Sequence, residues 1–407
     1  MRCITESKSC RSIVDLDDMK SSACNGPNSC SSESDILIEC STTQDDSSSS
    51  SSSTGSPKAP HGLRLPLVPE DSTDACLKSN PLLCSEAIEA LKNKVDTYSC
   101  DEIQVSASPI IYVHQREVAH ASTEQYESKG AILTSDNATT CHVLAFRSCV
   151  QGENNSKALG SLCHLDTTRN GSCIRKIINE HMIFHRCGMD RSNPKEKQVL
   201  MDVHIVGGYN DKDKTSEEIT NHVFDTLSKA AREFNSMLIM TLKTCVVTSL
   251  NDVGRYNYPS ASGPMARGLL LDVSSGQVNL LTSVNKNHKG PASTLRRVRL
   301  WAPPSQNDYL LVVHMWDKEE ICIEPFQFGP FPDMDLFLQL PDNTLLEYSS
   351  TSPECEADDF CDEMRETVKY MRDVPMESVF GRESKVVTYA LKKLSSPHNC
   401  DNSSGSC

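Results

Sequence analysis

The sequence predicts a mixed α/β (α+β) catalytic domain with a disordered N-terminal extension. Between residues 81 and 390, short runs of apolar and β-branched residues alternate with segments of helical spacing. Two pairs of these runs are separated by short polar turns, as in antiparallel hairpins. Helices interspersed with hairpins are typical of a domain built on mixed β-sheets.

Composition separates a folded region from two flexible ends. Residues 1–60 are rich in serine and acidic residues, with seven serines in a row from Ser47 to Ser53. Such a segment cannot bury enough apolar surface to offset chain entropy, so we expect a disordered extension. We expect residues 61–394 to form one catalytic domain, since no strong linker interrupts them, and residues 395–407 to form a flexible tail.

Net charge and cysteine content narrow the class of protein. Acidic residues number 55 and basic residues 40, so the formal net charge is −15. Nucleic acids and anionic membranes are bound by clustered Lys and Arg, so we expect neither as a partner. No apolar run approaches the ~20 residues of a membrane helix, and no apolar signal segment follows Met1. The 19 cysteines are an odd number at irregular spacings, which favours a reducing compartment over a disulfide framework.

The individual elements follow from apolar periodicity. Apolar runs predict single strands over residues 110–113, 141–146, 202–206 and 238–250. Two pairs of runs predict hairpins, 269–273 with 278–284 and 310–316 with 321–328. Apolar residues at helical spacing predict helices over 219–234 and 357–373. Thr215 and Glu218 have the spacing of a capping box before the first helix.

One cysteine lies where a nucleophile would be held firmly. The polar segment Ser135-Asp136-Asn137-Ala138-Thr139-Thr140-Cys141-His142 runs directly into an apolar strand. A side chain at such a junction is fixed by the sheet yet reachable from solvent, so Cys141 is a candidate nucleophile. The hydroxyls of Ser135 and Thr140 and the neighbouring backbone N–H groups are candidate donors to a developing oxyanion. An ordinary turn with a buried cysteine is the alternative reading of this segment.

A histidine and a carboxylate form the second candidate group. In a strand His164 and Asp166 point to the same face, so Asp166 would orient His164 as a base. Such a histidine favours the thiolate of a nearby cysteine, which is the attacking species. For His164 to act on Cys141, the loop between these two residues must bulge away from the site. Cys163, next to His164, is a second thiol that could form a disulfide with Cys141 upon oxidation.

Two further histidines raise the alternative of a zinc site. On a helix His181 and His185 lie on one face, where they could ligate zinc together with a cysteine. No close Cys-x-x-Cys pair accompanies them. Cys141 and Cys163 could join these histidines in one site, so the residues alone leave metal binding open.

Five segments together resemble the protein N-terminal asparagine amidohydrolase family. They are Tyr112-Val113-His114-Gln115-Arg116-Glu117, Asp136-Asn137-Ala138-Thr139-Thr140-Cys141, His164-Leu165-Asp166, Val203-His204-Ile205-Val206-Gly207-Gly208, and Ser350-Thr351-Ser352-Pro353 followed by Glu356. The segments occur in the motif order of that family, and the resemblance covers residues 65 to 390.

The resemblance implies a reaction and a site. The reaction is hydrolysis of the side-chain amide of an N-terminal Asn to Asp and ammonia, feeding N-degron proteolysis, with no metal and no organic cofactor. Cys141 would be the nucleophile and His164 the base, while Asp166 and Glu356 would read the α-ammonium of the substrate. The implied fold is similar to that of cysteine deamidases, with mixed β-sheets packed as a sandwich flanked by helices.

The same resemblance sets expectations about partners and compartment. The partners would be proteins or peptides with N-terminal Asn, and we expect a monomer in the cytoplasm, with the nucleus as a second compartment. Two alternatives stay open. One is a related cysteine deamidase acting on another protein amide, and the other is a catalytically inactive adaptor whose N-terminal extension recruits partners.

Overall fold

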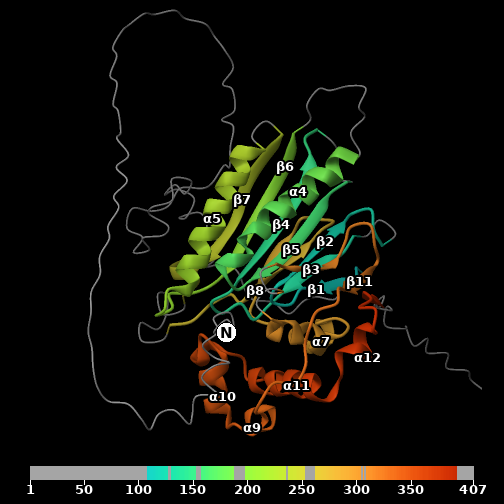
Figure 1. Cartoon of the computed structure of the whole chain (residues 1–407). Coiled ribbons are helices and arrows are strands. Elements are labelled where there is room, and N and C mark those ends of the chain that lie inside the picture. The colour runs from blue at the N-terminus through green and yellow to red at the C-terminus, as the bar shows by residue number, and fades with distance from the viewer. Residues whose placement is uncertain are drawn as a thin grey trace, which may run out of the picture.

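A computed structural model describes residues 108–391, apart from 127–129, 153–156, 188–197, 235–236, 253–261, 304–305 and 307–308. In Figure 1 the strands lie above a layer of C-terminal helices. The predicted extension over 1–60 and the predicted tail over 395–407 lie outside the described residues. No helix among the described residues is long and apolar enough to cross a membrane.

The larger sheet has six strands of mixed direction. Its order is β10 (Leu311–His314), β2 (Glu117–Ser122), β5 (Leu159–Leu165), β4 (His142–Val150), β6 (Val199–Gly207) and β7 (Leu238–Val247). The outer pairs, β10 with β2 and β6 with β7, are parallel, whereas the inner pairs are antiparallel. The predicted strands over 141–146, 202–206 and 238–250 correspond to β4, β6 and β7.

The smaller sheet has four strands. Its order is β1 (Ile110–Tyr112), β3 (Ile132–Ser135), β8 (Gly268–Asp272) and β9 (Val278–Leu281). Strands β8 and β9 pair antiparallel with Leu271 opposite Val278, which confirms the first predicted hairpin. The predicted strand over 110–113 is β1.

Alternation along the strands builds two cores and confirms the sandwich. On β4, Val143 and Ala145 face the small sheet, where they share one core with Leu133 and Leu269. Leu144, on the opposite face of β4, packs in the second core. That core lies under α4 (Ser172–Cys187) and α5 (Thr215–Glu233), which cross the outer face of the large sheet in Figure 1.

C-terminal helices cover the end of the sandwich where β1 and β3 lie. They are α7 (Ser293–Val298), α9 (Met334–Leu338), α10 (Asp342–Ser349), α11 (Phe360–Asp373) and α12 (Met376–Phe380), as Figure 1 shows. Short 3-10 segments join the elements: η2 (Thr168–Gly171), η3 (Thr248–Asn251), η4 (Lys286–His288), η5 (Arg299–Trp301) and η6 (Pro353–Cys355). The predicted helix over 357–373 corresponds to α11, whose Met364, Val368 and Met371 are buried.

Two local predictions were wrong. The second predicted hairpin does not form, because β10 pairs with β2 while β11 (Glu320–Ile323) pairs with β12 (Val387–Ala390). All residues of β2 are buried, so its backbone groups need strand partners on both sides, and β10 supplies one of them. The capping box is also absent, since Thr215 is already helical and the Asp211 carboxylate accepts from the backbone N–H groups of Thr215 and Ser216 at 2.9 Å each.

Candidate active site

The loop between β3 and β4 presents Cys141 at the edge of a pocket. Cys141 is only 4% exposed and directly precedes β4. The loop is tied down by the hydrogen bond from Ala138 N to Arg267 O, at 2.8 Å. Gly207, at the end of β6, has a φ of 127°, and a Cβ atom there would collide with the carbonyl oxygen of Cys141. Glycine at this position therefore lets β6 pack directly against the backbone of the cysteine.

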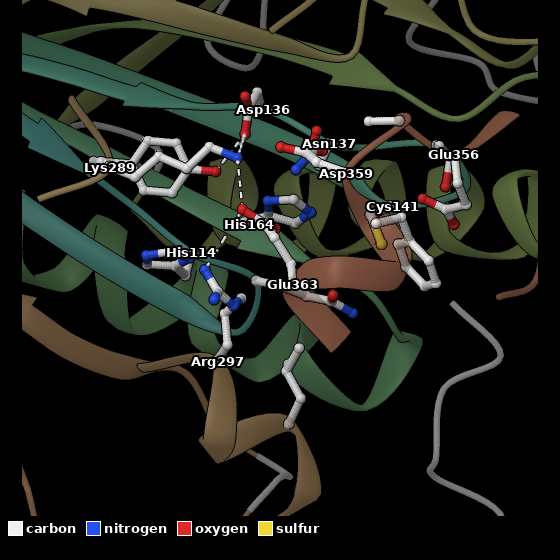
Figure 2. A pocket seen from close by; sticks show the side chains of 16 residues that line it. His114, Asp136, Asn137, Cys141, His164, Lys289, Arg297, Glu356, Asp359 and Glu363 are labelled. Carbon is white, nitrogen blue, oxygen red and sulfur yellow. Dashed lines mark hydrogen bonds and ion pairs between the residues drawn. The ribbon is translucent and has the colours of Figure 1, made fainter. Parts of the chain in front are cut away.

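Strand register brings His164 to the same pocket. In the antiparallel pairing of β4 with β5, His164 lies opposite Val143, two residues from Cys141. The connection between these strands begins at the other end of the pair, where Ser148 lies opposite Leu159, away from His164. Cys141 and His164 both line the pocket, as Figure 2 shows.

The ring of His164 is held on one side and open on the other. Its Nδ1 lies 2.9 Å from Ser135 Oγ. Its Nε2 is buried and has no hydrogen-bond partner among the described residues, so it makes no direct hydrogen bond with the thiol of Cys141. Burial lowers the pKa of His164 to about 4, although the Asp166 charge acts in the opposite direction. The ring is therefore neutral near pH 7 and able to accept a proton.

The other predicted site residues take different positions. Ser135 and Thr140 are not among the pocket residues, and their hydroxyls contact His164 and Thr351, the latter at 2.9 Å. Their predicted role as oxyanion donors thus stays a prediction without support from these contacts. The Thr140–Thr351 contact instead joins the nucleophile loop to the 350–353 motif.

Asp166 lies beyond the strand that carries His164. Strand β5 ends at Leu165, so the alternation that would place Asp166 beside His164 no longer applies. Its carboxylate accepts from Arg116 Nε at 2.6 Å and from Gln115 Nε2 at 2.7 Å, and Asp166 is not among the pocket residues. Asp166 thus fixes the β1–β2 loop, and its substrate-binding role stays a prediction.

Glu356 does line the pocket. The Ser350 hydroxyl donates to the Glu356 carboxylate, and Ser352 N donates to Ser350 Oγ at 2.9 Å. The 350–353 motif therefore connects two parts of the site, because it contacts the nucleophile loop through Thr351 and positions Glu356 through Ser350.

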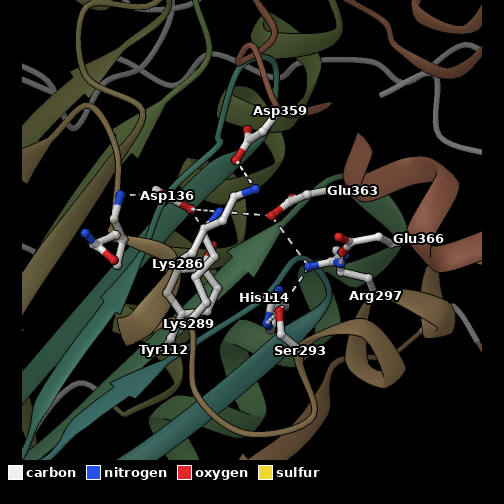
Figure 3. A network of polar contacts seen from close by, with 12 residues as sticks. Tyr112, His114, Asp136, Lys286, Lys289, Ser293, Arg297, Asp359, Glu363 and Glu366 are labelled. Carbon is white, nitrogen blue, oxygen red and sulfur yellow. Dashed lines mark hydrogen bonds and ion pairs between the residues drawn. The ribbon is translucent and has the colours of Figure 1, made fainter. Parts of the chain in front are cut away.

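A chain of alternating charges, which the sequence did not reveal, forms one wall of the pocket (Figure 3). Lys289 Nζ lies 3.8 Å from Asp136 Oδ1 and 3.5 Å from Glu363 Oε1. Arg297 Nη1 lies 3.5 Å from that same Glu363 oxygen. Asp136 belonged to a recognised motif, but Lys289 follows η4, Arg297 lies in α7 and Glu363 lies in α11, and these segments carry no motif. Only the fold brings them together.

Asp136 is the most enclosed member of this chain. It is 1% exposed, and Oδ1 accepts from the Tyr112 hydroxyl while Oδ2 accepts from Val284 N at 2.5 Å. Burial raises the pKa of Asp136, and the nearby Lys289 ammonium partly opposes that rise. Burial and the Asp136 charge also raise the pKa of Tyr112, which keeps its hydroxyl protonated as the donor.

The pocket carries an excess of negative charge. Its carboxylates are Asp136, Glu356, Asp359 and Glu363, and its cations are Lys289 and Arg297. The two pocket histidines do not add to the cations near pH 7, because burial lowers the pKa values of His114 and His164. The formal charge of the lining is therefore −2, which favours a cationic ligand.

Cys163 and the two helical histidines lie on the other face of the large sheet. Cys163 packs in the core beneath α4 and α5, whereas Cys141 packs in the core between the sheets. This separation contradicts both the Cys141–Cys163 disulfide and the alternative metal site that would join both cysteines. His181 and His185 both contact Ser148 Oγ, at 2.6 and 2.8 Å.

Comparisons with known proteins agree on one family. A family model described as protein N-terminal asparagine amidohydrolase matches residues 101–395. The protein N-terminal asparagine amidohydrolase of Homo sapiens is 27% identical over 275 residues, covering 67% of this chain and 77% of the relative. The protein of the same name from Mus musculus is 26% identical over 291 residues, covering 71% and 84%. That from Arabidopsis thaliana is 23% identical over 317 residues, covering 72% and 82%.

Proposed function

The chain belongs to the protein N-terminal asparagine amidohydrolase family, and from that premise we propose how its pocket carries out the reaction. The enzyme hydrolyses the side-chain amide of N-terminal asparagine in proteins and peptides, giving N-terminal aspartate and ammonia. The observation that supports this proposal best is the presence of Cys141 and His164 in one pocket of net negative lining. A nucleophile, a base and an attraction for a cationic chain end are thus combined.

The first half of the reaction releases ammonia. His164 Nε2 takes the proton of the Cys141 thiol, and the sulfur attacks the carbon of the side-chain carboxamide. The C–N bond then breaks as the imidazolium returns the proton to the departing nitrogen, which leaves as ammonia. A thioester between Cys141 and the aspartyl side chain remains. The open Nε2 and the neutral state of the ring suit this role.

The second half restores the thiol. His164 removes a proton from water, the resulting hydroxide attacks the thioester carbon, and the C–S bond breaks. The sulfur takes back the proton from the imidazolium, and N-terminal aspartate leaves. Asn137 lines the pocket beside Cys141, so its side-chain amide is a candidate oxyanion donor in both halves, in place of the hydroxyls expected from the sequence.

The product of the reaction indicates the step of protein turnover in which the enzyme would act. N-terminal aspartate would feed the N-degron pathway, and we place the reaction in the cytoplasm, with the nucleus as a second compartment. Glu356 is the residue of the 350–356 segment that lines the pocket, and we assign it to the substrate end of the site.

The test is ammonia release from peptides that differ only at the first residue. Peptides beginning with Asn, Gln, Asp and acetyl-Asn are incubated with the full chain, and ammonia is quantified over time. We expect release from the peptide with a free N-terminal Asn and none from the others. Equal release from acetyl-Asn would rule out recognition of the chain end, and release from none would favour the inactive adaptor.

A further inference from the structure

Glu363 has the position of a substrate-reading residue. It lies in the first turn of α11 and lines the same pocket as Cys141 and His164, with its side chain 15% exposed. The helix is fixed in rotation because Met364 and Val368 are buried in the core between the sheets and the C-terminal helices. The Glu363 carboxylate reaches toward Lys289 and Arg297 (Figure 3).

The nearest cation contacts of this carboxylate are both to one oxygen. Lys289 Nζ and Arg297 Nη1 both approach Oε1, each at 3.5 Å. That distance is longer than the usual 2.7–2.9 Å of a charge-assisted hydrogen bond. Across the described part of the chain, no hydrogen bond reaches Oε2 of Glu363. This carboxylate in the pocket wall thus keeps an oxygen that can accept a hydrogen bond from a ligand.

The neighbouring acidic residues are committed differently. Both oxygens of Asp136 are engaged, by Tyr112 on one side and by Val284 N on the other. Asp359 Oδ2 lies 3.2 Å from Lys286, and the Asp359 side chain is 33% exposed, against 15% for Glu363. Glu363 is therefore the more enclosed of these two pocket carboxylates, and its Oε2 accepts no hydrogen bond from the described residues. The open Nε2 of His164 in this pocket is a separate sign that a ligand completes the site.

From these contacts we propose that Glu363 is a specificity residue that receives the α-ammonium of the substrate through Oε2, while Lys289 and Arg297 hold Oε1. This inference rests on the proposed function. In asparagine only Cα and Cβ separate the ammonium nitrogen from the carboxamide carbon, so both groups must lie in one small pocket with Cys141. Acetylated chains and internal asparagines lack the charge that Glu363 would bind.

The experiment compares two variants on one helix with two peptides. Glu363→Gln removes the charge without changing the shape. Glu366→Gln is the matched control, because Glu366 pairs with the same Arg297 at 3.1 Å but is 62% exposed and does not line the pocket. One peptide begins with Asn, and the other begins with 3-carbamoylpropanoyl, which is asparagine without its α-amino group.

We expect Glu363→Gln to lower kcat/KM for the Asn peptide about 10- to 100-fold, the loss of one hydrogen bond between charged groups. It should leave the slow turnover of the desamino peptide within about twofold of wild type, so that the preference for the free amine collapses. Glu366→Gln should leave both rates near wild type. Unfolding temperatures of all variants show whether the fold is kept.

Three results would overturn the inference: an equal loss for both peptides, no loss for either, or a collapse of preference in Glu366→Gln. Glu363→Asp provides a second measurement, since it keeps the charge one methylene away and should retain a preference between those of wild type and Glu363→Gln. A preference at or below that of Glu363→Gln would count against the proposal. If wild type released no ammonia from the Asn peptide, the proposed function itself would fail, which distinguishes the two.

Discussion

Replacing Asp166 by Asn separates a structural role from a substrate-binding role. Asp166 and Arg116 form a fully buried ion pair, with side-chain exposures of 0% and 2% and a distance of 2.6 Å. Asn has the same shape as Asp but no charge, so the substitution removes the carboxylate charge that faces the buried Arg116 guanidinium. The expected loss of unfolding free energy is about 3 kcal/mol, the usual cost of breaking a buried pair from one side.

An exposed pair of the same chemistry provides the control. Glu233 accepts from Arg175 Nη2 at 2.5 Å, but these side chains are 42% and 65% exposed. Glu233→Gln should therefore lower the free energy of unfolding far less than Asp166→Asn does. Urea unfolding of both variants and wild type at pH 7 gives the two differences directly.

Activity assays on the same variants complete the test. Asp166→Asn should keep the ratio of kcat/KM between the Asn peptide and its desamino analogue, because the carboxylate lies outside the pocket. A variant with unchanged stability and a collapsed ratio would refute this reasoning. Asp166 would then be the residue that reads the ammonium, as the sequence predicted.

Three further predictions concern the residue that contacts the base, two buried histidines and the glycine behind Cys141. Ser135→Ala removes the hydroxyl that contacts Nδ1 of the proposed base and should lower kcat about 10- to 100-fold with little change in KM, measured by ammonia release. An unchanged kcat would contradict that positioning role. Burial lowers the pKa values of His120 and His142 to about 3, so below pH 6.5 the unfolded state binds protons that the folded state does not. Between pH 6.5 and pH 3, the free energy of unfolding should therefore fall by about 1.4 kcal/mol per pH unit for each histidine. Unfolding free energies equal at pH 7 and pH 5 would contradict this linkage. Gly207→Ala forces a Cβ into the backbone of Cys141, so it should destabilise the chain by more than about 1 kcal/mol and lower kcat. A fully active and stable variant would show that the close contact between β6 and the Cys141 backbone is not required.

Local patterns predicted most elements but not all of their partners. Apolar patterns identified the strands that became β4, β6 and β7 and the helix α11, because their apolar residues pack in the two cores. The pairing of β10 with β2 could not be predicted from the local sequence. Two adjacent apolar runs separated by a polar turn look like a hairpin whether or not they pair with each other. The capping box was wrong because α5 already begins at Thr215, the residue that the prediction placed just before the helix.

The site shows the same limit at the level of single residues. Cys141 and His164 were found from a loop-to-strand junction, a strand histidine and a family resemblance, and the β4–β5 register places them at one end of the same strand pair. Asp166 follows the last residue of β5, so strand alternation alone does not determine where its side chain points, and its role toward the substrate stays a prediction. Lys289 and Glu363 carry no motif, and their ion pair at 3.5 Å joins segments more than 70 residues apart.

The central claim is that the sulfur of Cys141 attacks the carboxamide, and ammonia release by two cysteine variants tests it most directly. Cys141→Ala removes the proposed nucleophile, while Cys163→Ala removes a buried thiol on the opposite face of the large sheet. With a peptide beginning with a free Asn, we expect Cys163→Ala to retain most of the wild-type kcat and Cys141→Ala to release no ammonia above background. Undiminished release by Cys141→Ala would contradict the mechanism.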